Sequence, residues 1–126
     1  MNINALCGRR ILVVEDQVAI ALDLCECLGQ EGANAIGPAC SVEDALRILE
    51  SVGPLDAAVL DVELAGEPVY AVADRLQQLG VPFLFTTGYE ATEIPDRYKL
   101  APLFEKPIGI SAILDAIEQQ LTHRAR

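Results

Sequence analysis

Short apolar runs alternate with segments of helically spaced apolar residues along this chain, and that alternation constrains its fold more than any other feature. A short run of Val, Ile, Leu and Ala predicts a strand that is buried on both faces, whereas apolar residues three and four apart predict an amphipathic helix. Strands that are joined through helices pair in parallel, with right-handed crossovers. The pattern repeats five times and therefore predicts a doubly wound α/β domain with helices on both faces of the sheet.

Glycine and proline residues mark the ends of several predicted strands. The strands are expected at residues 11–14, 33–37, 55–61, 81–85 and 102–104. The pair Gly37-Pro38 is expected to stop the second strand. The third strand ends in a carboxylate, Asp61, just before a loop that contains Gly66 and Pro68. Considered alone, Asp61 is equally well explained as a functional acid at a sheet edge, as a solvated loop residue or as a helix cap.

Helical spacing predicts regular helices between these strands. They are expected at residues 18–28, 41–52, 68–79 and 110–121. Ser41 with Asp44 three residues later is a short relative of the capping box, and Pro68 suits the first position of a helix. Segment 89–100 carries Pro95 in its middle, so the fourth helix in chain order is expected to be short or broken.

Charge and cysteine content narrow the possible functions. The 126 residues include 9 basic and 19 acidic ones, a net charge of −10, which disfavours direct binding to nucleic acid. The cysteines lack metal-ligand spacing, and we expect them to be small, buried, apolar residues in a reducing cytosol. They are Cys7, Cys25, Cys27 and Cys40. No stretch resembles a signal peptide or a membrane span. We therefore expect a cytoplasmic protein that does not bind membranes.

Polar side chains follow four of the predicted strands. They are Glu15 and Asp16 after the first strand, Asp61 at the end of the third, Thr87 after the fourth and Lys106 after the fifth. Because the carboxyl ends of parallel strands lie at one edge of a sheet, these five side chains should converge. Each residue alone has an ordinary explanation as a loop residue or helix cap. Three acids, a hydroxyl and an ammonium group together indicate a functional site.

The chemistry of this set favours a metal-assisted phosphoryl acceptor. Three neighbouring carboxylates repel one another, so either their pKa values rise or a divalent cation binds. Mg²⁺ prefers oxygen ligands and needs only one or two carboxylates. Asp61 could then attack a phosphoryl group as an ionised nucleophile, while Lys106 and Thr87 meet the charge on the phosphoryl oxygens. Pro107 could fix a sharp turn that aims the lysine, through a cis bond.

This pattern resembles the receiver domain of two-component response regulators over essentially the whole chain, 1–126. The resemblance implies a flavodoxin-like strand order 2-1-3-4-5 and a single receiver domain without an output domain. It implies that Asp61 is the phospho-acceptor, that Asp16 binds Mg²⁺ directly and that Glu15 assists. Glu63 would offer its backbone carbonyl to the metal, and Thr87 and Lys106 would contact the aspartyl phosphate. The expected partners are a histidine kinase or a phosphotransfer protein, with a downstream protein that the sequence does not identify.

The chain also departs from most receivers. The usual turn after the acceptor is replaced by the segment 64–70, and Leu103 stands three residues before the lysine, where most receivers have an aromatic residue that reports phosphorylation. With segment 85–89 and the broken fourth helix, the chain resembles the alphaproteobacterial subgroup called FATGUY receivers. That resemblance implies general stress signalling and a kinase of the HWE type. We expect residues 89–100, Leu103 and the last helix to change most on activation.

Several alternatives compete with this interpretation. A small haloacid-dehalogenase-like phosphatase also uses an aspartate nucleophile, but that family needs an Asp where this chain has Glu63, and its other acids lie downstream. A dinucleotide-binding module fails, because the turn after the first strand holds two acids and no glycine. A receiver-like interaction module that is never phosphorylated remains open. We expect a regulatory domain that assists only its own phosphorylation and dephosphorylation, not an enzyme that acts on other substrates.

Overall fold

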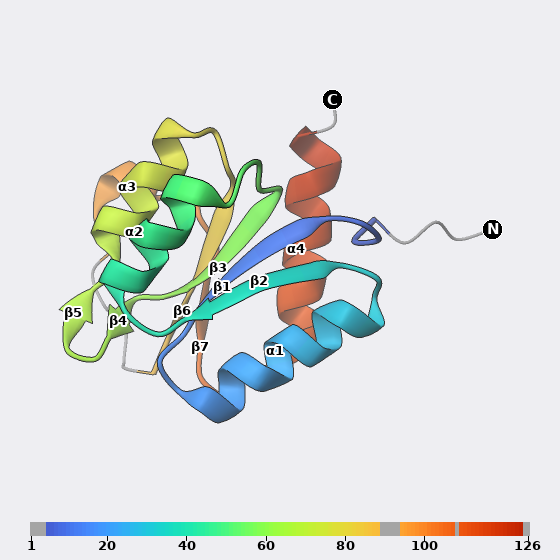
Figure 1. The fold of residues 1–126 in the computed structure, drawn as a ribbon, viewed down its shortest axis with the longest axis horizontal. Coiled ribbons are helices and arrows are strands. Elements are labelled where there is room, and N and C mark those ends of the chain that lie inside the picture. Colours follow the sequence, from blue (N-terminus) through green and yellow to red (C-terminus); the bar gives the residue numbers. More distant parts are fainter. Residues whose placement is uncertain (1–4, 89–93, 108, 125–126) are drawn as a thin grey trace.

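A five-stranded parallel sheet forms the central layer of the protein in a computed structural model, which describes residues 5–88, 94–107 and 109–124. The sheet has the order β2-β1-β3-β6-β7 (Figure 1). Its strands are β1 (Arg10–Val14), β2 (Asn34–Ala39), β3 (Ala57–Asp61), β6 (Phe83–Thr87) and β7 (Leu103–Glu105). Counted within this sheet, the order is the predicted 2-1-3-4-5, so the doubly wound fold is confirmed.

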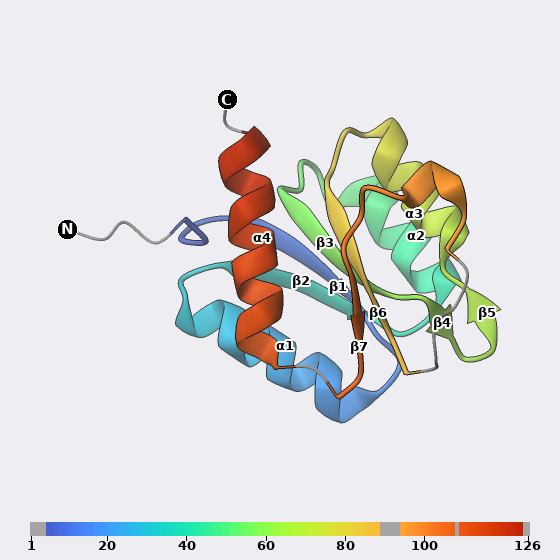
Figure 2. The same cartoon turned by 180° about the vertical axis from the view of Figure 1, so that it is seen from behind.

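Helices cover both faces of the sheet (Figures 1 and 2). The helices α1 (Val18–Gln30) and α4 (Ile110–Arg124) pack on one face, and α2 (Val42–Ser51) and α3 (Tyr70–Gln78) pack on the other. All five residues of β3 are buried, and its side chains alternate between the two cores, with Val59 on the α1 and α4 side and Leu60 on the α2 and α3 side. This alternation explains why the strand reads as a continuous apolar run.

The predicted start of α2 is confirmed. The Ser41 hydroxyl oxygen accepts a hydrogen bond from the Asp44 backbone N–H at 3.1 Å, which satisfies a donor in the first helical turn. The helix α1 also forms where it is predicted, with Ala21, Leu24 and Leu28 on its buried side. Val18 and Leu22, which the helical spacing included among its apolar positions, are exposed.

The prediction that Gly37-Pro38 stops the second strand is wrong. Strand β2 continues to Ala39, and its pairing with β1 shifts by one residue after the pair Leu12 and Ile36. Because β2 is an edge strand, it tolerates a proline that cannot donate to a neighbouring strand. Gly37 has a φ of +101°, a conformation that favours glycine, and this lets the chain continue through the irregularity.

The prediction that Pro68 opens the third helix is also wrong. Pro68 belongs to a two-stranded antiparallel hairpin of β4 (Glu63–Leu64) and β5 (Glu67–Pro68), and α3 begins at Tyr70. Both residues of the connecting turn have positive φ, +50° at Ala65 and +84° at Gly66, as tight hairpin turns require. Leu64 is buried and anchors the hairpin in the core.

A short 3₁₀ helix, η1 (Asp96–Tyr98), precedes β7, and within the described residues the expectation of a short or broken fourth helix is confirmed. Residues 89–93 of that segment lie outside the described residues. Tyr98 is 1% exposed, and its hydroxyl lies within hydrogen-bond distance of two acceptors, the Tyr70 carbonyl at 3.1 Å and the Asp74 carboxylate. Arg97 Nε donates to the same carboxylate at 3.0 Å. These contacts fix η1 on α3.

The cysteines are free thiols, and the prediction that all are buried is wrong. Cys7 and Cys40 are exposed, and Cys25 and Cys27 are half-buried. The described cysteines belong to no cluster that could hold a metal ion. Among the helices of the described residues, none has the length and apolar character to cross a membrane.

A pair of Gly→Ala substitutions tests the account of β2. A Cβ at Gly37 would lie 2.8 Å from the Ala39 backbone nitrogen and 3.0 Å from the Val13 carbonyl oxygen, whereas a Cβ at Gly29 in α1 meets nothing within 4 Å. We expect Gly37→Ala to lower the free energy of unfolding by more than about 1 kcal/mol and Gly29→Ala to raise it by about 0.5 kcal/mol. Urea unfolding measures both. Equal effects of the two variants would contradict the assigned backbone geometry.

Candidate functional site at the sheet edge

The carboxyl ends of the parallel strands bring the predicted acids together. Glu15 and Asp16 follow β1, and Asp61 ends β3, which pairs with β1. Each of the three offers a carboxylate oxygen, and these oxygens lie within 4.8 Å of one another. Glu15 and Asp61 are buried, while Asp16 is half-buried. The predicted convergence of the acids is therefore present in the structure.

Lys106 lies among these acids, as predicted. Its Nζ is 2.8 Å from Glu15 Oε1 and 3.0 Å from Asp61 Oδ2. The lysine comes from the turn after β7, where the Lys106-Pro107 peptide bond is cis as expected. The Lys106 backbone N–H donates to the Thr87 carbonyl at 2.7 Å, which ties this turn to the end of β6. The lysine side chain is only 12% exposed, so its charge is largely shielded from water and interacts strongly with the two carboxylates.

The close packing of this cluster shifts the pKa values of Glu15 and Lys106. Burial and the nearby Asp61 carboxylate raise the pKa of the Glu15 carboxyl to about 7, and hydrogen bonds from Lys106 and the Gln17 N–H lower it only in part. Burial lowers the pKa of the Lys106 ammonium, but its hydrogen bonds with Glu15 and Asp61 and the attraction of their charges together outweigh burial and leave that pKa raised. One ammonium group therefore does not neutralise the whole cluster, and a further cation would stabilise the ionised carboxylates.

The β4–β5 hairpin also contacts the acids through its backbone. The Ala65 N–H donates to Asp16 Oδ2 at 2.8 Å, and the Glu63 N–H donates to Asp61 Oδ1 at 3.2 Å. The hairpin thus holds one oxygen of Asp16, the predicted metal ligand, and one oxygen of Asp61, the predicted acceptor. Sequence patterns do not single out Ala65, because a backbone donor carries no side-chain signal.

A cavity of about 250 Å³ opens on the site. It is lined by Asp16, Gln17, Asp61, Glu63, Ala65, Gly66, Gly88 and Lys106. Three carboxylates in close contact, one of them with a raised pKa, are an all-oxygen donor set of the kind that Mg²⁺ prefers. The residues present therefore fit the predicted cation.

The remaining predicted residues are placed as follows. Thr87 is buried at the end of β6 beside the lysine turn. Glu63 lines the cavity with its side chain exposed. The roles of the Thr87 hydroxyl and the Glu63 carbonyl stay predictions. Leu103 is 37% exposed on the edge strand β7.

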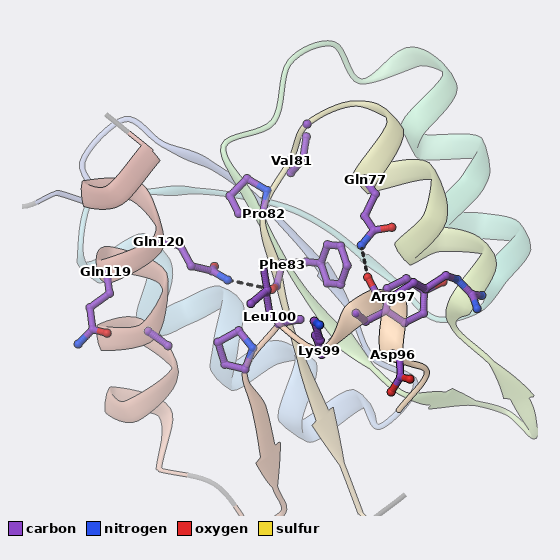
Figure 3. A pocket seen from close by; sticks show the side chains of 15 residues that line it. Gln77, Val81, Pro82, Phe83, Asp96, Arg97, Lys99, Leu100, Gln119 and Gln120 are labelled. Atoms are coloured by element: carbon purple, nitrogen blue, oxygen red, sulfur yellow. Dashed lines mark hydrogen bonds between the residues drawn. The ribbon is translucent and has the colours of Figure 1, made fainter. Parts of the chain in front are cut away.

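A wider groove of about 810 Å³ lies at the opposite end of the strands (Figure 3). It is formed where β6 begins, between the end of α3, η1 and α4. Gln120 of α4 donates to the Phe83 carbonyl at 2.8 Å, and Gln77 of α3 donates to the Arg97 carbonyl at 2.9 Å (Figure 3). No residue of the acidic cluster lines this groove.

Comparison with known proteins identifies the class. No family model matches the chain. SdrG from Sphingomonas melonis Fr1, known from a solution structure, is 33% identical, with a TM-score of 0.78, and the match covers 94% of this chain and 99% of SdrG. The receiver domain of the hybrid histidine kinase CckA is 28% identical, with a TM-score of 0.74, and the match covers 89% of this chain and 98% of that one. The chain belongs to the response regulator receiver family.

Longer regulators also contain this sequence pattern. The phyllosphere-induced regulator PhyR of Methylorubrum extorquens is 32% identical over 114 residues, which are 88% of this chain and 43% of PhyR. The chain spans about half the length of the curated relatives that it matches. The more specific FATGUY assignment stays a prediction.

The raised pKa of Glu15 predicts a pH dependence of stability. Because the folded protein holds this proton more tightly than the unfolded chain, protonated Glu15 stabilises the fold at low pH, and this contribution is lost as pH rises from about 4.5 to about 7. We expect the free energy of unfolding of the wild type, in EDTA, to fall relative to that of Glu15→Gln across this window. Urea unfolding at a series of pH values measures the difference, and parallel curves for the two proteins would contradict the assignment.

Proposed function

We propose that this protein is a phosphorylatable signalling switch whose acceptor is Asp61. The observation that carries the proposal is the placement of Asp61 beside two further carboxylates, Glu15 and Asp16, and beside the Lys106 ammonium, with Asp61 open to a cavity. Each Asp61 oxygen is already held by a donor, Oδ1 by the Glu63 N–H and Oδ2 by Lys106 Nζ. A carboxylate that is fixed by two donors and open to a cavity is suited to attack a phosphoryl group.

The transfer would replace one bond to phosphorus with another. An Asp61 oxygen attacks the phosphorus of a phosphohistidine, the P–N bond breaks, and an aspartyl phosphate forms. Lys106 faces the acceptor oxygen and would meet the negative charge of the phosphoryl oxygens. Mg²⁺ held by Glu15, Asp16 and Asp61, with the Glu63 carbonyl, would offset the charge that the carboxylates and the phosphoryl group share. The chain would assist only its own phosphorylation and dephosphorylation.

The similar proteins support a phosphorelay setting. CckA is a hybrid histidine kinase and PhyR a regulator by their names, so receivers of this kind occur together with histidine kinases. We propose a histidine kinase, of the HWE type, or a phosphotransfer protein as the donor. The output would be contact with another protein or onward transfer of the phosphoryl group.

The route by which the signal leaves the site would pass through β6 and η1. Thr87 and Phe85 are two residues apart on β6, so their side chains lie on the same face of the sheet. The Phe85 ring contacts the buried Tyr98 ring, with centroids 5.6 Å apart. We propose that the aromatic groups on this route are Phe85 and Tyr98, rather than a residue at position 103.

Phosphorylation by a small donor tests the acceptor. We expect acetyl phosphate with Mg²⁺ to add one phosphoryl group to the wild type and to Asp23→Asn, which changes an exposed aspartate of α1. Asp61→Asn should gain none, because an amide is not a nucleophile of this kind, and EDTA should abolish the reaction of the wild type. Intact-protein mass spectrometry measures the products. Equal phosphorylation of the wild type and Asp61→Asn would exclude Asp61 as the acceptor.

Hydrogen exchange tests the route of the signal. We expect beryllofluoride with Mg²⁺ to change exchange most in residues 94–103 and α4. These residues follow β6, and η1 is only one 3₁₀ turn, with few internal hydrogen bonds to hold it. The α2 helix on the far side of the sheet from β7 serves as the internal reference. Changes confined to α2, with none in residues 94–103, would contradict this route.

A further inference from the structure

The Lys106 ammonium has a third acceptor that the motif does not include. Besides Glu15 and Asp61, Lys106 Nζ donates to the side-chain oxygen of Gln17, at 2.9 Å from Oε1. An ammonium group has three protons, so these three acceptors satisfy all of them. Gln17 is exposed and directly follows the acid pair.

Gln17 contacts both members of the Glu15–Lys106 ion pair. Its backbone N–H donates to Glu15 Oε2 at 3.1 Å, and the same oxygen accepts from Lys106 Nζ at 3.0 Å. The three residues therefore form a closed ring of hydrogen bonds. Gln17 is also the N-cap residue of α1, but its side chain makes no capping hydrogen bond. The carboxamide binds the lysine instead of the helix end.

We propose that Gln17 is a positioning residue for Lys106, which holds the ammonium at the mouth of the cavity, facing the acceptor oxygen of Asp61. This inference rests on the proposed function of Asp61. Gln17 and Lys106 both line the cavity, and Lys106 Nζ is 3.0 Å from Asp61 Oδ2. A lysine held from two sides loses less rotamer freedom when it meets a phosphoryl group than a lysine that must first be ordered.

The Gln17 side chain carries no charge, and this suits the role of positioning Lys106. The other two acceptors of Lys106 are carboxylates, which repel an incoming phosphoryl group and would also serve as metal ligands. A carboxamide oxygen holds the ammonium without adding negative charge to the cavity. A glutamate at position 17 would hold the lysine as firmly but would repel the phosphoryl oxygens.

Two substitutions separate positioning from a merely structural effect. Gln17→Met keeps the length of the side chain and removes its oxygen, whereas Gln17→Glu keeps an oxygen acceptor and adds a charge. Gln30→Met changes an exposed glutamine at the far end of the same helix and serves as the control. Nitrogen-15 relaxation of the Lys106 ammonium, without Mg²⁺ or fluoride, measures its order parameter. A titration with beryllofluoride and Mg²⁺ measures the dissociation constant for a phosphoryl mimic.

We expect Gln17→Met to lower the order parameter of the Lys106 ammonium and to raise the Kd for beryllofluoride about fivefold. Gln17→Glu should keep the wild-type order parameter and still raise the Kd, because its charge repels the ligand. Gln30→Met should change neither. An ammonium in Gln17→Met as ordered as in the wild type would overturn the proposal, as would an unchanged Kd in Gln17→Met or equal effects of Gln30→Met.

The two readouts also separate this inference from the proposed function. If the wild type bound no beryllofluoride, the proposed function of the Asp61 site would fail. The order parameter of the Lys106 ammonium in Gln17→Met would still decide whether Gln17 positions the lysine.

Discussion

The ion pairs of Lys106 with Glu15 and Asp61 are the interaction on which this structure depends. One ammonium group lies within 3.0 Å of both carboxylates, at the edge of a sheet whose central strand, β3, is otherwise apolar. Removing one member of such a group leaves charge in a poorly hydrated place, which is strongly destabilising. The fold therefore retains a cluster with excess negative charge, and that excess makes it receptive to a cation.

The rest of the fold positions this cluster. The parallel strands place Glu15, Asp61 and Lys106 at one edge, although they come from distant parts of the chain. The buried alternation of β3 fixes its register, so Asp61 ends the strand at the cavity. The hairpin that follows returns two backbone N–H groups to the acids, while the wide groove lies at the other end of the strands. The acidic site and the wider groove therefore lie at opposite ends of the strands.

Much of this arrangement was predictable from the sequence, for physical reasons. A buried parallel strand reads as a short apolar run, and polar residues that follow such runs must share an edge, so Asp16, Asp61 and Lys106 could be assigned together. The errors fall where local signals conflict with tertiary context. Proline suits the first position of a helix, but Pro68 lies in a hairpin set by the turn at Ala65 and Gly66. Gln17 and the Ala65 N–H act through hydrogen bonds that no spacing rule encodes.

The central claim is that Asp61 carries the phosphoryl group, and chemical trapping tests it most directly. Borohydride reduces an aspartyl phosphate to homoserine, so treatment of the phosphorylated protein followed by peptide sequencing locates the modified residue. The account predicts homoserine at position 61 and unchanged aspartate at position 16. Homoserine at position 16, or at any other aspartate with Asp61 intact, would contradict it.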